Sequence, residues 1–263
     1  MQFIDTHSHL YLPEFDNDRD EVINRAIREG IEKICLPNID TRSIKPMMDL
    51  VNKYPDFCFP MIGLHPTSVK KNYLDILKKI QEHLLKENFI AIGEIGIDLY
   101  WDNTWKEEQK KAFREQIGLA IDNHLPVVIH IRESFDEVFH ILDEFKPDYP
   151  EGIFHSFTGN LDQAHRAIGM GFKLGIGGIV TFKNARLDMV IKHIDIKHIV
   201  LETDSPYLAP VPKRGKRNES SYLVYTAQKI SELHNITIEK IADITTQNAI
   251  KIFKLKKNIV SSV

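Results

Sequence analysis

The stretch Phe3-Ile4-Asp5-Thr6-His7-Ser8-His9 begins with apolar residues and ends with two histidines spaced two apart. Because successive side chains of a β-strand point to opposite faces, a strand over residues 3–9 would direct His7 and His9 to the same side. Two imidazoles on one face at the end of a strand can form half of a metal site. The pair alone is also consistent with solvated histidines on an edge strand, so its interpretation depends on the rest of the chain.

Short apolar runs alternate with helical periodicity along all 263 residues. Strands are predicted over 3–9, 31–36, 57–64, 89–95, 126–131, 152–157, 172–176 and 198–201. Helices are predicted over 18–28, 43–53, 73–86, 105–123, 134–145, 162–170, 184–193, 219–233 and 237–253. Eight units of roughly 33 residues favour an α/β fold, a (β/α)8 TIM barrel forming one domain over 1–263. An open doubly wound sheet is the alternative, although no glycine-rich phosphate-binding turn follows the first strand.

The composition is that of a globular protein, with 43% apolar and 27% charged residues and a net charge of −3. A nucleic acid would therefore need a local basic patch rather than a uniformly positive surface. Cys35 and Cys58 lie in apolar and aromatic runs, which favours buried reduced thiols over a disulfide framework. We find no targeting leader and no apolar run of about 18 residues, so we expect a cytoplasmic protein without membrane association.

The predicted strands end in metal-ligating and acid–base side chains. In a (β/α)8 barrel the catalytic groups lie at the C-terminal ends of the strands. Five of the twelve histidines and two carboxylates are found at or near those ends: His7, His9, His65, Glu94, His130, His155 and Asp204. Most are separated by about one or two βα units, so we expect them to converge on one face.

This set of side chains suits two divalent cations. Neutral imidazoles and carboxylates bind Zn²⁺, Mn²⁺ and, with more oxygen ligands, Mg²⁺, and the absence of a nearby thiolate disfavours a structural zinc. A carboxylate such as Glu94 can bridge two cations. A second carboxylate can orient the attacking water and accept its proton, and Asp204 at the end of the eighth strand is our candidate for this general base.

Several motifs together resemble the TatD family of metal-dependent deoxyribonucleases, which belongs to the amidohydrolase-like TIM barrels. They are Asp5-Thr6-His7-Ser8-His9-Leu10, Gly63-Leu64-His65-Pro66, Gly93-Glu94-Ile95-Gly96-Ile97-Asp98, His130-Ile131-Arg132, His155-Ser156-Phe157-Thr158-Gly159, Glu202-Thr203-Asp204-Ser205-Pro206-Tyr207-Leu208 and Pro212-Lys213-Arg214-Gly215-Lys216-Arg217-Asn218-Glu219. The resemblance implies two metal ions held by His7, His9, Glu94, His130, His155 and Asp204. It also implies hydrolysis of DNA phosphodiester bonds by an exonuclease, with RNA as an alternative substrate and no obligate protein partner.

Further residues near the expected site have a structural and a functional interpretation. His65 either bonds a loop carbonyl or donates to a substrate phosphate as an acid beside the metals. Arg132 is two residues after His130 and is either simply exposed or clamps phosphate, which its place at the barrel mouth favours. Glu202 and Asp5 either form buried ion pairs or orient ligand histidines.

The segment after the eighth strand carries four cations in five residues: Lys213, Arg214, Lys216 and Arg217. Such a run is commonly a solvated loop, but its place above the catalytic face favours contact with a phosphate backbone, and we include Arg214 among the substrate-binding residues. Tyr100, Trp101 and Phe182 are expected in loops of the same face, where they either pack the loops or stack on bases.

Two other functional classes remain open. One is an amide, lactone or ester hydrolase on the same barrel, including a deacylase of aminoacyl-tRNA. Many such relatives bridge their metals with a modified lysine at the fourth strand, and Glu94 at this position favours a phosphodiesterase. The other is a metal-binding protein without catalysis, and the complete ligand set with a candidate base argues against it.

Overall fold

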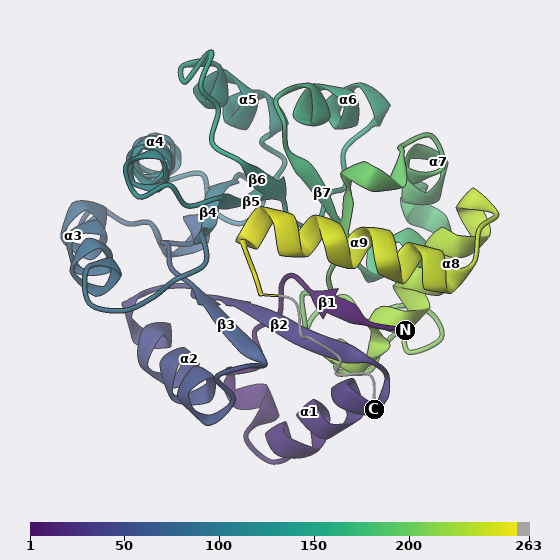
Figure 1. The fold of residues 1–263 in the computed structure, drawn as a ribbon. Coiled ribbons are helices and arrows are strands. Elements are labelled where there is room, and N and C mark those ends of the chain that lie inside the picture. Colours follow the sequence, from purple (N-terminus) through teal and green to yellow (C-terminus); the bar gives the residue numbers. More distant parts are fainter. Residues whose placement is uncertain (257–263) are drawn as a thin grey trace.

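A computed structural model describes residues 1–256 as a ring of eight parallel strands surrounded by helices (Figure 1). Residues 257–263 of the expected domain lie outside this description. The strands are β1 (Phe3–Asp5), β2 (Ile31–Pro37), β3 (Cys58–Met61), β4 (Ile92–Asp98), β5 (Val127–Arg132), β6 (Gly152–Phe154), β7 (Lys173–Ile176) and β8 (Ile199–Leu201).

Backbone pairing closes the strands into a barrel. Two parallel sheets, β1–β3 and β4–β8, are joined at both seams by single bridges, Ile62 with Ile92 and Ser8 with Ser205. Closure leaves no sheet edge to be covered, and it brings all eight strand ends to one mouth. The predicted (β/α)8 barrel is therefore confirmed, and the doubly wound alternative is wrong.

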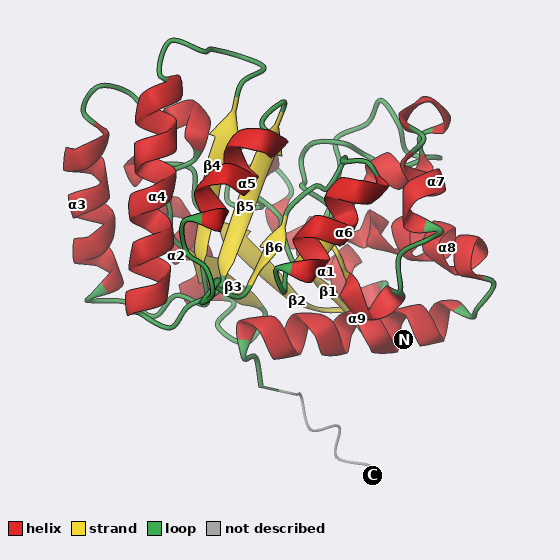
Figure 2. Ribbon diagram, turned by 90° about the horizontal axis from the view of Figure 1, so that it is seen from above, coloured by secondary structure: helices red, strands yellow, loops and turns green. Residues whose placement is uncertain are grey.

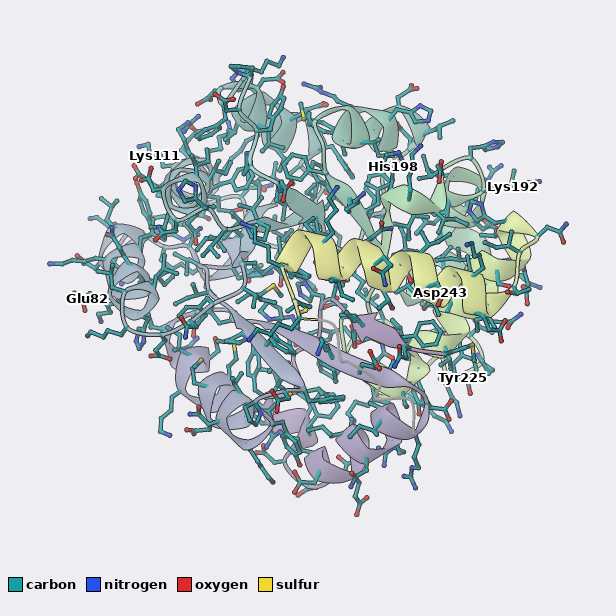
Figure 3. The ribbon with its side chains drawn as sticks, in the orientation of Figure 1. Glu82, Lys111, Lys192, His198, Tyr225 and Asp243 are labelled. Carbon is teal, nitrogen blue, oxygen red and sulfur yellow. The ribbon has the colours of Figure 1, made fainter. Side chains whose placement is uncertain are left out.

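Amphipathic helices cover the outside of the barrel. They are α1 (Arg19–Arg28), α2 (Thr41–Lys53), α3 (Tyr73–Leu84), α4 (Lys106–Asp122), α5 (Phe135–Asp143), α6 (Leu161–Gly169), α7 (Leu187–Ile191), α8 (Leu223–His234) and α9 (Ile238–Phe253). Their charged residues, for example Glu82 on α3 and Lys111 on α4, lie at the periphery (Figure 3). Helix α7 is shorter than the predicted 184–193 because the chain begins that segment as a 3₁₀ turn, Lys183–Ala185.

Helix α9 closes the end of the barrel opposite to the strand C-termini (Figure 2). Ile252 and Phe253 join a buried cluster with barrel residues from several strands, among them Met61, Val128 and Val200. The mouth at the other end is thus the open one. None of the helices within residues 1–256 has the length and apolar character needed to cross a bilayer.

Two strands differ from prediction in a way that shapes the mouth. Strand β1 ends at Asp5, so His7 and His9 lie beyond the regular ladder. Strand β4 runs to Asp98, and its register with β5 shifts between Gly93 and Ile95, which leaves Glu94 as a bulge residue. A bulge changes the direction in which a side chain points. This one directs Glu94 to the barrel axis from within the strand and not from its end.

Candidate metal centre

The structure brings all six predicted metal ligands together at the mouth of the barrel. His7 and His9 follow β1, Glu94 and His130 lie in β4 and β5, His155 directly follows β6, and Asp204 follows β8. Their donor atoms form overlapping groups in which each atom lies within 4.8 Å of the others, and His65 joins one of these groups.

Glu94 occupies the centre of this cluster and directs its two oxygens to different histidines. Oε2 lies 3.1 Å from His7 Nε2 and 3.7 Å from His9 Nε2. Oε1 lies 2.8 Å from His130 Nδ1 and 3.6 Å from His155 Nε2. One carboxylate therefore divides the ring nitrogens into two sets, which is the arrangement that a bridging ligand requires.

The charge of Glu94 is maintained although its side chain is buried. Burial would raise the pKa of this carboxyl, but the surrounding His65, His7 and His155 outweigh burial and hold the pKa well below its usual range. Glu94 is thus an anion that needs positive charge around it.

His9 is oriented by a partner on its outer nitrogen. Its Nδ1 lies 3.0 Å from the hydroxyl oxygen of Tyr11, and that hydroxyl donates to Pro37 O at 2.6 Å. Because the hydroxyl proton is used, Tyr11 accepts from His9 Nδ1–H, and the lone pair of Nε2 faces Glu94 and Asp204.

His155 is oriented by Glu202. Its Nδ1 lies 3.0 Å from Glu202 Oε1, so Nε2 faces the centre. Burial would lower the pKa of His155, but the Glu202 and Glu94 carboxylates outweigh it and raise the pKa to about 10. Gly175 makes room for Glu202, since a Cβ there would lie 2.2 Å from Glu202 Oε2. The contact is a buried ion pair that also orients the His155 ring, so Glu202 has both of the roles considered for it.

His130 lies between two carboxylates. Its Nδ1 faces Glu94, and its Nε2 lies 2.9 Å from Asp98 Oδ2. Burial would lower the pKa of His130, but the hydrogen bonds to Asp98 and Glu94 raise it to about 9. Asp98 therefore fixes the outer nitrogen and leaves Nδ1 to face the centre.

His7 differs from His130 and His155 because its pKa is lowered and not raised. Burial and the neighbouring His155, whose ring is stacked at 3.4 Å between centroids, lower the pKa of His7 to about 3. Its buried Nδ1 has no hydrogen-bond partner among the described residues. A neutral imidazole whose Nε2 points at a carboxylate is the form in which histidine binds a metal.

Asp204 completes the cluster from the side of β8. Its backbone is left-handed, with φ of +55°, and its amide donates to His7 O at 2.9 Å, which anchors the turn to β1. Oδ1 lies 3.6 Å from His9 Nε2 and 3.8 Å from His155 Nε2. Burial would raise the pKa of Asp204, but the neighbouring histidines His9, His155 and His7 outweigh burial and lower it.

His65 also faces the carboxylate of Glu94. Its Nδ1 accepts from the Thr67 backbone amide at 3.2 Å, so the proton of the neutral ring is on Nε2, 3.3 Å from Glu94 Oε1. Burial lowers the pKa of His65. The predicted loop bond is made to an amide and not to a carbonyl, because residues 66–68 form a 3₁₀ turn capped by His65.

These residues form a donor set suited to divalent cations. The inward nitrogens of His9, His130 and His155 are each selected by a partner on the outer nitrogen, and the donors are imidazoles and carboxylates without thiolates. The outer partners Tyr11 and Asp98 were not assigned from sequence. Asp98 lies in a quoted motif, whereas nothing local marks Tyr11 except its place two residues after His9.

Asp5 has neither of the roles expected for it. Its carboxylate accepts from Thr203 N and Thr203 Oγ1 at 2.9 and 2.6 Å and from the backbone amide of His7 at 3.3 Å. Burial raises the pKa of Asp5 to about 7. Asp5 therefore ties β1 to the segment after β8 and does not orient the His7 ring, because its short side chain is used across the seam.

A cavity of about 600 Å³ opens above the cluster. Its lining includes five of the six predicted ligands, all but His7, together with Arg132, Trp101, Tyr207 and Leu208. The Arg132 guanidinium lies 3.8 Å from the centre of the Tyr100 ring and 5.0 Å from that of Trp101. Tyr100 and Trp101 are 51% and 69% exposed, so the rim presents aromatic faces and a cation beside the centre.

The basic run after β8 divides into residues with different surroundings. Arg217 makes a bidentate ion pair with Asp18 at 2.8 and 2.7 Å, so its charge is used within the fold. Arg214 lies 3.9 Å from the centre of the Phe182 ring and forms no ion pair within residues 1–256. Phe182 therefore packs against a loop arginine, and Arg214 does not line the cavity described above.

Comparison with known proteins agrees with this architecture. The family model described as "TatD related DNase" matches residues 4–254. A metal-dependent hydrolase of Bacillus subtilis, YabD, is 42% identical over 95% of this chain and 98% of its own length. A protein of Pectobacterium parmentieri named 3'-5' ssDNA/RNA exonuclease TatD is 30% identical over 94% of this chain and 97% of its own.

A solved structure has a similar fold over nearly the whole chain. YJJV, a TatD homologue from Escherichia coli, superposes with a TM-score of 0.90 at 29% identity, and the match covers 97% of this chain and 98% of that one. The protein is accordingly a metal-dependent hydrolase that acts on ester bonds. The coverage, the order of the motifs and the barrel together show that this chain belongs to the TatD family.

Proposed function

We propose that this protein is an exonuclease that hydrolyses phosphodiester bonds at the ends of DNA, with RNA as an alternative substrate. Two divalent cations, drawn from Zn²⁺, Mg²⁺ and Mn²⁺, would be held by His7, His9, Glu94, His130, His155 and Asp204. The observation that carries the proposal is the division of ring nitrogens between the two oxygens of Glu94. The name of the Pectobacterium relative agrees with a nucleic-acid substrate. The two cysteines are buried and free, so we propose the reducing cytoplasm as the compartment.

When bound, the cations would neutralise phosphate charge and lower the pKa of a water molecule. Glu94 would bridge the two positions, and the outer partners Tyr11, Asp98 and Glu202 would keep the ligand rings fixed. Asp204 would accept a proton from the attacking water, since its carboxylate is anionic and its side chain is 16% exposed toward the mouth. His65 would donate from Nε2–H to a phosphate oxygen.

The rim supplies contacts suited to a nucleic-acid end. Arg132 has a guanidinium that forms no ion pair within the described part of the chain and can bind phosphate bidentately. Exposed Tyr100, Trp101 and Tyr207 offer faces on which an unpaired base can stack. Both kinds of contact tolerate any base sequence, as an exonuclease requires.

Asp204→Asn tests the proposed base. The amide keeps the shape and one oxygen but cannot accept the proton, so we expect single-turnover hydrolysis to fall about 10²–10⁴-fold. The assay uses metal-loaded protein and end-labelled single- and double-stranded DNA, RNA and aminoacyl-tRNA, with metal content and DNA affinity measured in parallel. A rate within a few-fold of wild type would exclude Asp204 as base, and release of the amino acid from tRNA alone would contradict the nuclease assignment.

Metal binding should strengthen as the pH rises. His130 and His155 have pKa values raised to about 9 and 10, so both rings carry an extra proton at pH 7 that a cation must displace. Each displaced proton changes the affinity by about tenfold per pH unit below these values. Calorimetric titration with Mn²⁺ between pH 6.5 and 8.5, in two buffers of different ionisation enthalpy, measures affinity and proton release. An affinity independent of pH, with no proton release, would contradict the raised pKa values of these two rings.

Arg214 and Arg217 should respond differently to truncation. If Arg214 contacts a phosphate, Arg214→Ala weakens binding of single-stranded DNA and reduces the salt slope by about 0.7. Arg217→Ala serves as the matched control, because its guanidinium pairs with Asp18, and we expect a lower melting temperature with an unchanged slope. Equal slopes for wild type and Arg214→Ala would show that the loop is only a solvated surface.

A further inference from the structure

The carboxylate of Asp98 connects the metal centre to the aromatic rim. One oxygen, Oδ2, lies 2.9 Å from His130 Nε2. The other, Oδ1, accepts from the backbone amides of Tyr100 and Trp101 at 3.0 and 3.3 Å. A single buried side chain is therefore shared between a proposed metal ligand and the loop of residues 99–105, which we call the aromatic arm.

Asp98 itself is held firmly. Its backbone amide donates to Gln109 Oε1 at 2.9 Å, and its carbonyl accepts from Gln109 Nε2 at 3.1 Å. Gln109 is buried on α4, so strand β4 and helix α4 fix the Asp98 backbone from both sides. A change in the position of the His130 ring can therefore reach the aromatic arm through the carboxylate of Asp98.

The arm contacts β5 a second time at its tip. Arg132, two residues after His130 on β5, lies over the rings of Tyr100 and Trp101. The His130 contact at the base and the Arg132 contact at the tip together set the position of Trp101, which lines the cavity above the metal centre.

We propose that Asp98 is a positioning residue that couples cation binding at His130 to the placement of the aromatic arm. In the structure His130 bonds both Glu94 and Asp98. A cation bound at Nδ1 would take the place of the Glu94 contact, and Asp98 would then be the protein group that holds the outer nitrogen of the ring. The two arm amides share that carboxylate, so the loaded centre presents Trp101 to an unpaired base in a defined position. This inference rests on the proposed function for its substrate, a single-stranded nucleic acid.

The experiment uses the fluorescence of Trp101. The protein has two tryptophans, and Trp105→Phe leaves Trp101 as the only reporter. We expect Zn²⁺, which is diamagnetic, to shift the emission of Trp101 and its quenching by acrylamide in parallel with calorimetric binding. Unchanged emission and quenching at saturating Zn²⁺ would overturn the proposal without any further variant.

Asp98→Asn, made in the Trp105→Phe protein, separates the two functions of the carboxylate. The amide oxygen can still accept from the arm, so emission without metal should match the parent. Its NH₂ group faces His130 Nε2 and drives the ring proton to Nδ1, so Zn²⁺ affinity should fall about 10–100-fold. At saturating Zn²⁺ the Trp101 response should be lost. A full Trp101 response at saturation would show that Asp98 supports the metal only and would overturn the coupling.

Asp102→Asn is the matched control, since Asp102 lies in the same arm and caps Thr104 N but is not in contact with His130. We expect it to retain the parental Zn²⁺ affinity and Trp101 response, and loss of that response would overturn a specific role for Asp98. Binding of a phosphorothioate single-stranded oligonucleotide is measured on the same proteins. A Trp101 response to Zn²⁺ without oligonucleotide binding would reject the proposed function and leave the coupling intact.

Discussion

A buried carboxylate among five histidines is the constraint on which the site depends. The Glu94 side chain is almost fully buried. Because an unpaired buried charge is very costly, the groups around Glu94 must balance its negative charge. The ring nitrogens of His7, His65 and His130 lie within 3.3 Å of its oxygens. Cations between these groups would satisfy the same carboxylate and would release the histidines as neutral ligands.

The barrel makes this arrangement possible because the six ligands come from five different strands, β1, β4, β5, β6 and β8, whose ends meet at one mouth. Closure at the β1–β8 seam is reinforced by Asp5 with Thr203 and by the amide of Asp204, so the two ends of the ligand set are held to each other. The bulge in β4 brings Glu94 to the axis, and helix α9 fills the opposite end. Tyr11, Asp98 and Glu202 contact the outer nitrogens of His9, His130 and His155, and these contacts decide which nitrogen of each ring faces the centre.

Sequence periodicity was sufficient to predict the eight strands and the residues that converge, because strand ends in a closed barrel share one face. It could not locate the bulge at Glu94, since a shift in register depends on pairing with β5. Tyr11 and Asp98 were missed as orienting partners because their role follows from contacts with His9 and His130 across the mouth. Arg217 was counted with the basic loop, yet its partner Asp18 is 199 residues away in the chain.

Crystals of the Mn²⁺-loaded protein test the central claim most directly, through an anomalous difference map at the manganese edge. The account predicts two peaks at Glu94, one on the side of Oε2 with His7 and His9 and one on the side of Oε1 with His130 and His155. A single peak away from Glu94, or two peaks that share no carboxylate, would contradict it.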